Sequence, residues 1–348
     1  MASLYDPFLL GEEIKSILDI DRSPSLRIGR GVSDDLQKEA LKSLIQKFAP
    51  DWISLQFVCY GFHPKGFVYG WGNRLSTVAP KVPWQIMFHE VWLGERSGSS
   101  FKEKCVGKVQ KFFVRDLVRK ISPRVIHTSN STYAQILLAI GMKAKVLDLI
   151  GGVPIPEIID SEYGNGYLSE RLGFDKNIER SEWWWTGIYG ALHSSWPAEP
   201  LFFQLQKIAR SLGKKVAFFH LGRSRGGEGL LNQLKAKYQT EDFRIVALGE
   251  KLEEEIPCLL RQFDFGIAAT PWQIIGKSST VATLLELGIA VIVNREEPYE
   301  VREETMQDNL LIRLDNNFEK EFLNRLEKRD PKSRQERISR QMIEDLSK

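Results

Sequence analysis

The feature of the sequence that most constrains its fold is an alternation of short apolar runs with longer segments of helical period, which begins near residue 50. The apolar runs are bounded by Pro, Gly or polar residues and are short enough to be strands buried on both faces. Strands that alternate with helices in this way form βαβ units, in which the strands are parallel. Because the pattern occurs twice, it predicts two parallel-sheet domains.

Two sets of elements follow from this alternation. In the first half of the chain the predicted strands are Trp52–Val58, Trp84–Phe88, Arg124–Thr128 and Lys145–Ile150. In the second half they are Trp183–Tyr189, Lys215–Leu221, Phe243–Leu248, Asp264–Ala269, Ile289–Asn294 and Leu310–Ile312. The predicted helices between them are Asp35–Phe48, Phe101–Ile121, Ser131–Ile140, Glu199–Leu212, Gly229–Tyr238, Leu252–Gln262 and Ser278–Leu287.

The length of 348 residues also favours two domains over one. We place an N-terminal domain at 1–156 and a C-terminal domain at 183–325. The stretch from Gly151 to Arg180 has several glycines, Pro154, Pro156 and no clean period, so we place a predicted linker at 157–182. The charged residues 326–348 have a helical pattern and form a predicted tail. Since ligands of parallel α/β domains bind beyond the carboxyl ends of the strands, we expect a site in a cleft between the two sheets.

Composition and charge exclude several classes of function. The 48 Lys and Arg residues nearly balance the 45 Asp and Glu residues, which leaves +3, too little for a surface that grips nucleic acid throughout. The three cysteines have no metal-ligand spacing, and Asp19 and Asp21 form an isolated D-x-D triplet to which we assign no metal. No apolar stretch is long enough to span a membrane. These features favour a cytoplasmic protein, at most peripheral to the inner face of a membrane.

The strongest local motif runs from Asp264 to Asn294 and has the order strand, loop, helix, strand. Ser278, Ser279 or Thr280 can cap the helix, whose free N–H groups and dipole suit a phosphate. Gly276 and Lys277 precede the cap, and Lys277 adds a positive charge. The alternative is an ordinary capped crossover helix. A P-loop is not favoured, because Pro271 stands where its first glycine is required.

The run Asp264–Asn294 resembles the donor-binding segment of GT-B glycosyltransferases, in particular the family-four group also called glycosyl transferases group 1. Further segments in the order of that family are Gly187–Gly190, Val216–Gly222 and Phe243–Gly249 on the donor side, and Met87–Glu90, Val125–Asn130 and Leu147–Pro154 on the acceptor side. The resemblance implies two Rossmann-like parallel-sheet domains that face a cleft. It also implies transfer of a sugar from a nucleotide-sugar donor to a glycan or lipid-linked acceptor, with retention and without metal or cofactor.

The acceptor-side candidates follow the predicted strands of the N-terminal domain. By the resemblance His89 contacts the transferred sugar, and Glu90 beside it could bind an acceptor hydroxyl or act as a base. His63 follows the preceding strand, and His127 and Asn130 complete a polar rim. The alternative for His89 and Glu90 is a polar pair that caps the next turn.

Donor-side candidates follow the strands of the C-terminal domain. The resemblance assigns the glycine turns at Gly190 and Gly249 to the donor. The family's diphosphate-binding Arg and Lys are replaced by Ala191 and Ala198, so other cations must offset the phosphate charge. The candidates, with their alternatives of a solvated turn or an ordinary loop residue, are Arg223, Arg225, Lys277 and His193.

The family's pair of glutamates falls at Ile275 and Thr283, and Glu286 is out of register. These replacements keep two alternatives open. One is a non-catalytic GT-B-like binding or scaffold protein, and the other is a different GT-B enzyme such as a nucleotide-sugar epimerase, which needs carboxylates in the cleft.

The predicted helix Phe101–Ile121 is strongly basic. From Lys102 to Arg124 there are eight basic residues and only two acidic ones. A basic stripe consists of Lys104, Lys108, Lys111, Arg115 and Arg119, and an adjacent apolar stripe consists of Val106, Val109, Phe113, Leu117 and Ile121. The stripe is either a solvated face or a binding surface for anionic lipid headgroups.

Overall fold

The computed structural model describes residues 2–3, 14–18, 24–28, 31–174, 180–224, 226–301 and 308–348. Its contacts divide the chain into two compact units. The N-terminal unit comprises 1–129, 133–146 and 344–348, and the C-terminal unit comprises 130–132 and 147–343. The first crossing of the chain between units thus lies near residue 130.

The N-terminal unit contains a parallel sheet with the strand order β4-β5-β6-β7. Its strands are β4 (Ile53–Phe57), β5 (Trp84–Phe88), β6 (Val125–Thr128) and β7 (Lys145–Val146). The helices α1 (Asp34–Phe48), α4 (Phe101–Ile121) and α5 (Ser131–Leu138) lie where helical periodicity predicted them. Every residue of β5 is buried, as expected of a strand that is apolar except for Gln85.

Five short elements of this part of the chain were missing from the prediction. Three strands, β1 (Ala2–Ser3), β2 (Ile14–Leu18) and β3 (Pro24–Ile28), form a sheet in the order β1-β3-β2. The helices α2 (Cys59–Phe62) and α3 (Trp71–Val78) follow β4. These elements have two to eight residues, so periodicity offers little signal for any of them.

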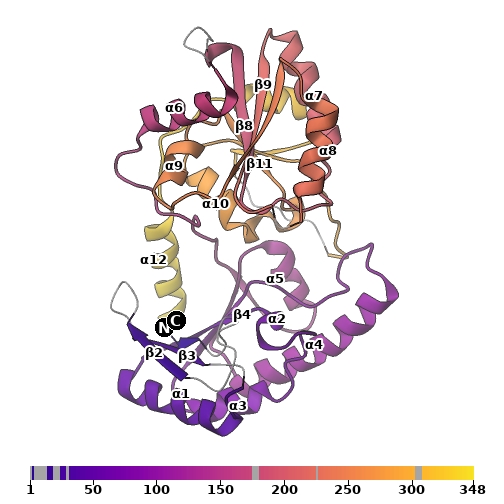
Figure 1. The fold of residues 1–348 in the computed structure, drawn as a ribbon. Coiled ribbons are helices and arrows are strands. Elements are labelled where there is room, and N and C mark those ends of the chain that lie inside the picture. Colours follow the sequence, from indigo (N-terminus) through magenta and orange to yellow (C-terminus); the bar gives the residue numbers. More distant parts are fainter. Residues whose placement is uncertain are drawn as a thin grey trace. The chain divides into compact units, whose positions relative to one another are not determined.

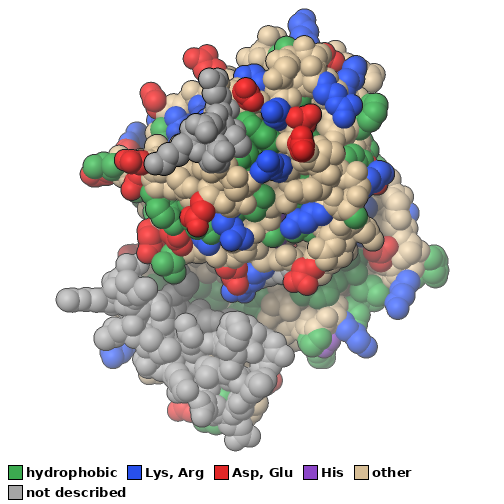
Figure 2. Space-filling model, turned by 45° about the horizontal axis from the view of Figure 1, so that its top comes forward, with side chains coloured by type: hydrophobic (Ala, Val, Ile, Leu, Met, Phe, Trp, Pro, Cys, Tyr) green, Lys and Arg blue, Asp and Glu red, His purple; other side chains and the backbone are tan. Residues whose placement is uncertain are grey.

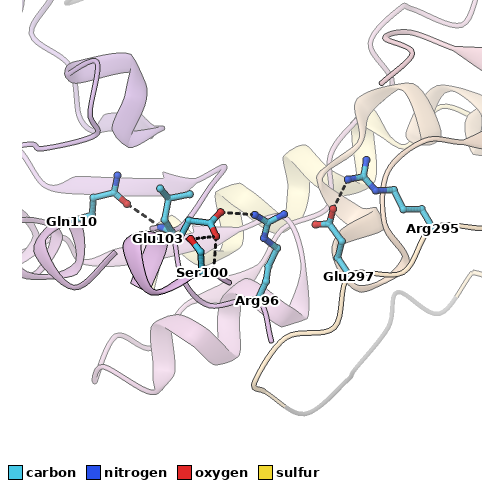
Figure 3. Close-up of polar contacts among 7 residues, drawn as sticks. Arg96, Ser100, Glu103, Gln110, Arg295 and Glu297 are labelled. Carbon is cyan, nitrogen blue, oxygen red and sulfur yellow. Dashed lines mark hydrogen bonds and ion pairs between the residues drawn. The ribbon is translucent and has the colours of Figure 1, made fainter. Parts of the chain in front are cut away.

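Helix α4 begins at a capping box. The Ser100 hydroxyl accepts a hydrogen bond from the Glu103 backbone N–H at 3.2 Å, and the Glu103 carboxylate accepts from the Ser100 backbone N–H at 2.7 Å (Figure 3). Arg96 also donates to Glu103 at 3.1 Å. The buried face of the helix consists of Gly107, Gln110, Val114, Leu117 and Ile121. The predicted apolar stripe was therefore wrong at Val109, which is exposed.

The C-terminal unit is built on a second parallel sheet, with the strand order β10-β9-β8-β11-β12-β13. The strands are β8 (Trp183–Tyr189), β9 (Lys215–Leu221), β10 (Phe243–Gly249), β11 (Phe265–Ala268), β12 (Val291–Val293) and β13 (Leu311–Arg313). Among the helices around it are α7 (Ala198–Ser211), α8 (Glu228–Tyr238), α9 (Glu255–Leu260) and α10 (Ser279–Glu286). Figure 1 shows α7 and α8 on one side of the sheet and α9 on the other. The order along the sheet reverses between β8 and β11, which is the switch point of a doubly wound fold.

The run of three tryptophans that opens β8 lies in the core of this unit. Trp183, Trp184 and Trp185 are all buried. Their rings point to alternate faces of the sheet, because Trp184 packs edge-on against Phe322 at 5.2 Å while Trp185 packs against Phe219 at 5.8 Å. The prediction that these residues belong to strand and core is confirmed.

The segment 157–182 is not a plain linker, because it contains the twelve-residue helix α6 (Ser161–Leu172). Asp160 caps the helix by accepting from Tyr163 N–H at 2.8 Å, and Gly173 ends it in the left-handed region. Gly164 lies directly against the Cys258 carbonyl of α9. Helix α11 (Phe318–Asn324) precedes the segment 326–348 that we predicted as a helical tail, and that segment contains α12 (Gln335–Leu346).

Candidate functional site

Three neighbouring strands of the C-terminal unit end in a glycine at the same edge of the sheet. Gly190, Gly222 and Gly249 follow or end β8, β9 and β10 with φ of +99°, +132° and +71°. Gly190 N–H donates to the Leu221 carbonyl at 2.8 Å, and Gly222 N–H donates to the Gly249 carbonyl at 2.9 Å. We call these three residues the glycine edge. It lies at the carboxyl ends of parallel strands, where doubly wound folds bind their ligands.

The glycine edge allows the end of β8 to approach α10 closely, and the end of β9 to approach the end of β8. A Cβ at Gly190 would lie 2.7 Å from Thr280 Cγ2, and a Cβ at Gly222 would lie 2.7 Å from the Gly190 carbonyl oxygen. No larger residue fits either position, and the positive φ values also favour glycine. The first turn of α10 therefore lies beside the end of β8, at the switch point.

The N-terminus of α10 is capped as predicted. Ser278 is the capping residue and its hydroxyl accepts from Val281 N–H at 3.3 Å. Ser278 and Thr280 share a hydrogen bond at 3.0 Å, while Ser279 is exposed. Gly276 and Lys277 lie just before the cap, in the 3-10 helix η2 (Trp272–Lys277). A helix N-terminus with a lysine beside it is an electropositive end.

His220, in the buried strand β9, was not among the sequence candidates. Its Nε2 donates to the Gly190 carbonyl at 3.0 Å, so it holds the turn after β8 in place. Burial lowers the pKa of the ring, although the bond to Gly190 opposes this shift. Its Nδ1 is buried and has no hydrogen-bond partner within the described ranges. A histidine in an otherwise apolar strand was the available signal, but the sequence could not show what it faced.

The predicted cations lie around this edge with partners of their own. The Arg223 guanidinium is hydrogen-bonded to the carboxylate of Glu250, and both side chains are exposed. His193, in the exposed loop after β8, accepts at Nδ1 from the Ser195 backbone N–H at 3.1 Å. Arg225 lies outside the described residues. The face of this unit seen in Figure 2 has basic and acidic side chains interspersed.

Thr283 and Glu286 bind the backbone of Gly151 and Gly152, near the point where the chain enters this unit. Thr283 Oγ1 accepts from Gly152 N–H at 2.8 Å, and Glu286 Oε1 accepts from the N–H groups of Gly151 and Arg334, both at 3.2 Å. Both side chains are buried. These two positions of α10 are thus occupied by contacts within the protein.

His89 follows β5 in the N-terminal unit, as predicted. Its backbone N–H donates to the Phe57 carbonyl at 3.1 Å, and its Nε2 lies 2.7 Å from Gln56 Oε1. Burial lowers the pKa of His89, and the charge of Glu90 opposes that shift. Burial together with Glu90 raises the pKa of the Cys59 thiol to about 11. His89 and Glu90 are therefore close together and half-buried, with a neutral imidazole favoured near neutral pH.

The other acceptor-side candidates lie differently from the prediction. His63 accepts at Nδ1 from Lys65 N–H at 3.1 Å, so it caps its own loop. His127 is wholly buried within β6 and hydrogen-bonded to Gln85 and Asp345, so it is not part of a polar rim. Asn130 is also buried and belongs to the C-terminal unit. Both were placed at a rim because they come late in an apolar strand, but the sequence did not reveal what covers them.

Within the described residues no group of three or more His, Cys, Asp or Glu side chains is arranged to hold a metal ion. None of the helices in the described part of the chain is long and apolar enough to cross a membrane.

Comparison with solved structures defines the fold. The chain is similar to the catalytic domain of starch synthase IV from Arabidopsis thaliana bound to ADP and acarbose, with a TM-score of 0.50 and 12% identity over 91% of this chain and 81% of that chain. It is also similar to a glycosyltransferase from Rickettsia africae, with a TM-score of 0.52 and 15% identity over 88% of this chain and 74% of that chain. No protein-family model and no curated protein sequence matches it. The predicted class, two Rossmann-like parallel-sheet domains of the GT-B type, is confirmed.

Proposed function

We propose that the chain is a glycosyltransferase that takes a sugar from a nucleotide-sugar donor bound at the glycine edge and the N-terminus of α10. The observation that carries this proposal is the close packing of Gly190 against Thr280 at the switch point. Only a glycine lets the end of β8 approach α10 so closely. The positive end of the α10 dipole in such an arrangement suits a diphosphate. Lys277 would add the positive charge that the family's Arg and Lys supply elsewhere.

The N-terminal unit would bind the acceptor, a glycan or a lipid-linked glycan, near His89 and Glu90. No carboxylate can be named as a covalent nucleophile, so retention would rest on positioning of the two substrates and stabilisation of the departing diphosphate. The positive end of α10 and Lys277 would stabilise that leaving group without requiring a metal.

A second candidate is a GT-B-like protein that binds a ligand without transferring a sugar. Three observations favour it. Ala191 and Ala198 lack the family's cations, Thr283 is engaged with the backbone of Gly152, and Arg223 is paired with Glu250. The epimerase alternative would need cleft carboxylates, and no observation favours it.

Nucleotide binding tests the donor site. We expect UDP, GDP or ADP, alone or as a sugar conjugate, to raise the melting temperature, and Lys277→Ala to weaken the affinity about tenfold, since a hydrogen bond to a charged group contributes about 1.5 kcal/mol. Titration calorimetry on the best nucleotide measures this. Lys214→Ala is the matched control, because Lys214 precedes β9 at the opposite edge of the sheet.

Equal affinities of wild type and Lys277→Ala would remove Lys277 from the donor site. Binding without donor hydrolysis or transfer to any acceptor would favour the non-catalytic protein. No stabilisation by any nucleotide would contradict the donor site itself.

We also propose that α4 contacts an anionic membrane surface. The exposed basic residues Lys104, Lys108, Arg115 and Arg119 lie on one helix face, which also contains the exposed rings of Phe101 and Phe112. Lys111 does not belong to this surface, because its side chain is only 30% exposed and its ammonium is paired with Glu95 at 2.9 Å. Arg119 is paired with Asp116, but its side chain is 77% exposed. Basic side chains with aromatic rings among them are typical of helices that lie in a membrane interface.

Vesicle sedimentation tests this surface. We expect binding to vesicles with anionic lipid and none to neutral vesicles. Lys108→Ala should weaken binding about fivefold, since each basic residue near such a surface contributes about 1 kcal/mol. Phe112→Ser should weaken it further, and the exposed Lys47 of α1 provides the control variant Lys47→Ala. Equal sedimentation with both kinds of vesicle would contradict the proposal.

A further inference from the structure

A continuous chain of hydrogen-bonded side chains runs from His89 across the sheet of the N-terminal unit. His89 contacts Gln56 at 2.7 Å, Gln56 contacts Ser54 at 2.7 Å, and Ser54 contacts Gln85 at 2.5 Å. Gln85 then contacts His127 at 3.0 Å, and His127 contacts Asp345 of α12 at 3.1 Å. We call these six residues the polar chain. Its members come from β4, β5, β6, α12 and the loop after β5, and all belong to one unit.

At the Asp345 end of the polar chain the direction of the hydrogen bond is fixed. Asp345 is 8% exposed and accepts from the ammonium of Lys145 as well as from His127. Burial alone would raise the pKa of Asp345, but the bonds from Lys145 and His127 outweigh it and lower the pKa below its usual value. The carboxylate is therefore ionised and can only accept hydrogen bonds, so His127 must donate to it from Nε2.

The direction of each further hydrogen bond in the polar chain follows from the one before it. Gln85 donates from Nε2 to His127 Nδ1, so that ring is neutral and the Gln85 Oε1 faces Ser54. The Ser54 hydroxyl has one proton, which it donates to Gln85, and its oxygen accepts from Gln56 Nε2.

The oxygen of the Gln56 amide determines which ring nitrogen of His89 is protonated. Because Nε2 of Gln56 donates to Ser54, its Oε1 faces His89 Nε2 and can only accept. His89 Nε2 must therefore carry a proton. In the neutral ring, which burial favours, Nδ1 then has the lone pair.

We propose that Asp345 sets the tautomer of His89 through the polar chain, with His127, Gln85, Ser54 and Gln56 as positioning residues. Held in this state, neutral His89 presents a hydrogen-bond acceptor at Nδ1. It would receive a hydrogen bond from a hydroxyl of the bound sugar or acceptor, whereas a carbonyl or phosphate oxygen would find no proton there. This consequence for the substrate rests on the proposed function, but the tautomer itself does not.

The tautomer can be measured directly in the protein without any ligand. Proton–nitrogen NMR on protein with isotopically labelled histidine distinguishes the protonated ring nitrogen from the other one. The five histidines give few signals, and His89→Gln and His127→Gln identify the two that matter. In the wild type we expect both His89 and His127 to carry the proton on Nε2.

Asp345→Asn reverses the end of the chain without changing its shape. We expect the new amide oxygen to keep the hydrogen bond from the Lys145 ammonium, so that the NH2 group faces His127 and donates to it. His127 then carries its proton on Nδ1, and the Gln85 amide turns over and donates to Ser54 from Nε2. We expect the Ser54 hydroxyl proton, which Gln85 no longer accepts, to turn to Gln56, whose amide then also turns over. We expect His89 to change from an Nε2 proton to an Nδ1 proton, together with His127.

Ser54→Ala provides the control. Ser54 occupies an exposed position of β4, and its hydroxyl links the two halves of the polar chain, so the substitution interrupts the chain there. In the double variant with Asp345→Asn, His127 should still change and His89 should no longer follow it. An unchanged His89 in Asp345→Asn, or a change that persists in the double variant, would overturn the proposal. Because nothing in the measurement depends on a nucleotide or sugar, its failure is distinct from failure of the proposed function.

Discussion

Glu286→Ala should lower the free energy of unfolding by about 3 kcal/mol, because two backbone N–H groups lose their acceptor and each unsatisfied donor in a buried site costs about 1–3 kcal/mol. The carboxylate of Glu286 is 3% exposed and binds the N–H groups of Gly151 and Arg334. Urea unfolding of the full chain, followed by circular dichroism, measures the change.

Glu286→Gln is the matched control for this prediction. The amide has the same shape and keeps one oxygen as an acceptor, so we expect a loss of about 1 kcal/mol. Equal losses in the two variants would mean that the charge matters rather than the acceptor geometry. No loss in Glu286→Ala would contradict the structural role of this carboxylate.

A second large effect on stability is expected in helix α6, where Gly166 provides the control for Gly164. A Cβ at Gly164 would lie 2.2 Å from the Cys258 carbonyl oxygen of α9, so Gly164→Ala must push two helices apart. We expect it to lower the free energy of unfolding by about 3 kcal/mol, as overpacked cores do. Gly166 lies two residues further along the same helix, and a Cβ there meets nothing within 4 Å.

Gly166→Ala should therefore stabilise the protein by about 0.5–1 kcal/mol, since alanine loses less backbone entropy in a helix than glycine does. Chemical unfolding of both variants under the same conditions gives the comparison. If Gly164→Ala were as stable as Gly166→Ala, α6 would not pack on α9 as described, and the segment would behave as the plain linker that the sequence predicts.

The sequence predicted most of the two sheets because buried parallel strands are mostly apolar. Trp84–Phe88, Trp183–Tyr189 and Lys215–Leu221 were predicted with the bounds that the structure has. Helix α6 was missed for a definite reason. It contains Gly164 and Gly166 and has little apolar periodicity, so its burial depends on α9 rather than on a pattern of its own.

The candidate site was predictable in part. Residues that follow strands, such as Gly190, Gly249 and His89, could be assigned to strand ends because a parallel sheet brings those ends together. Their partners could not be predicted. Asp345 lies 218 positions from His127, and only the folded chain brings the two together. Hydrophobic periodicity shows which face of a strand is buried, but it does not show which segment covers that face.

The contact between Thr283 and Gly152 has a consequence for any attempt to restore the family's carboxylate. Thr283 is fully buried, its hydroxyl binds the Gly152 N–H, and a Cβ added at Gly151 would already lie 3.0 Å from that hydroxyl. A longer, charged side chain at position 283 would meet the backbone of these two glycines. Thr283→Glu alone would thus disrupt the path of the chain into this unit, and installing the carboxylate would require redesign of the segment around Gly151 as well.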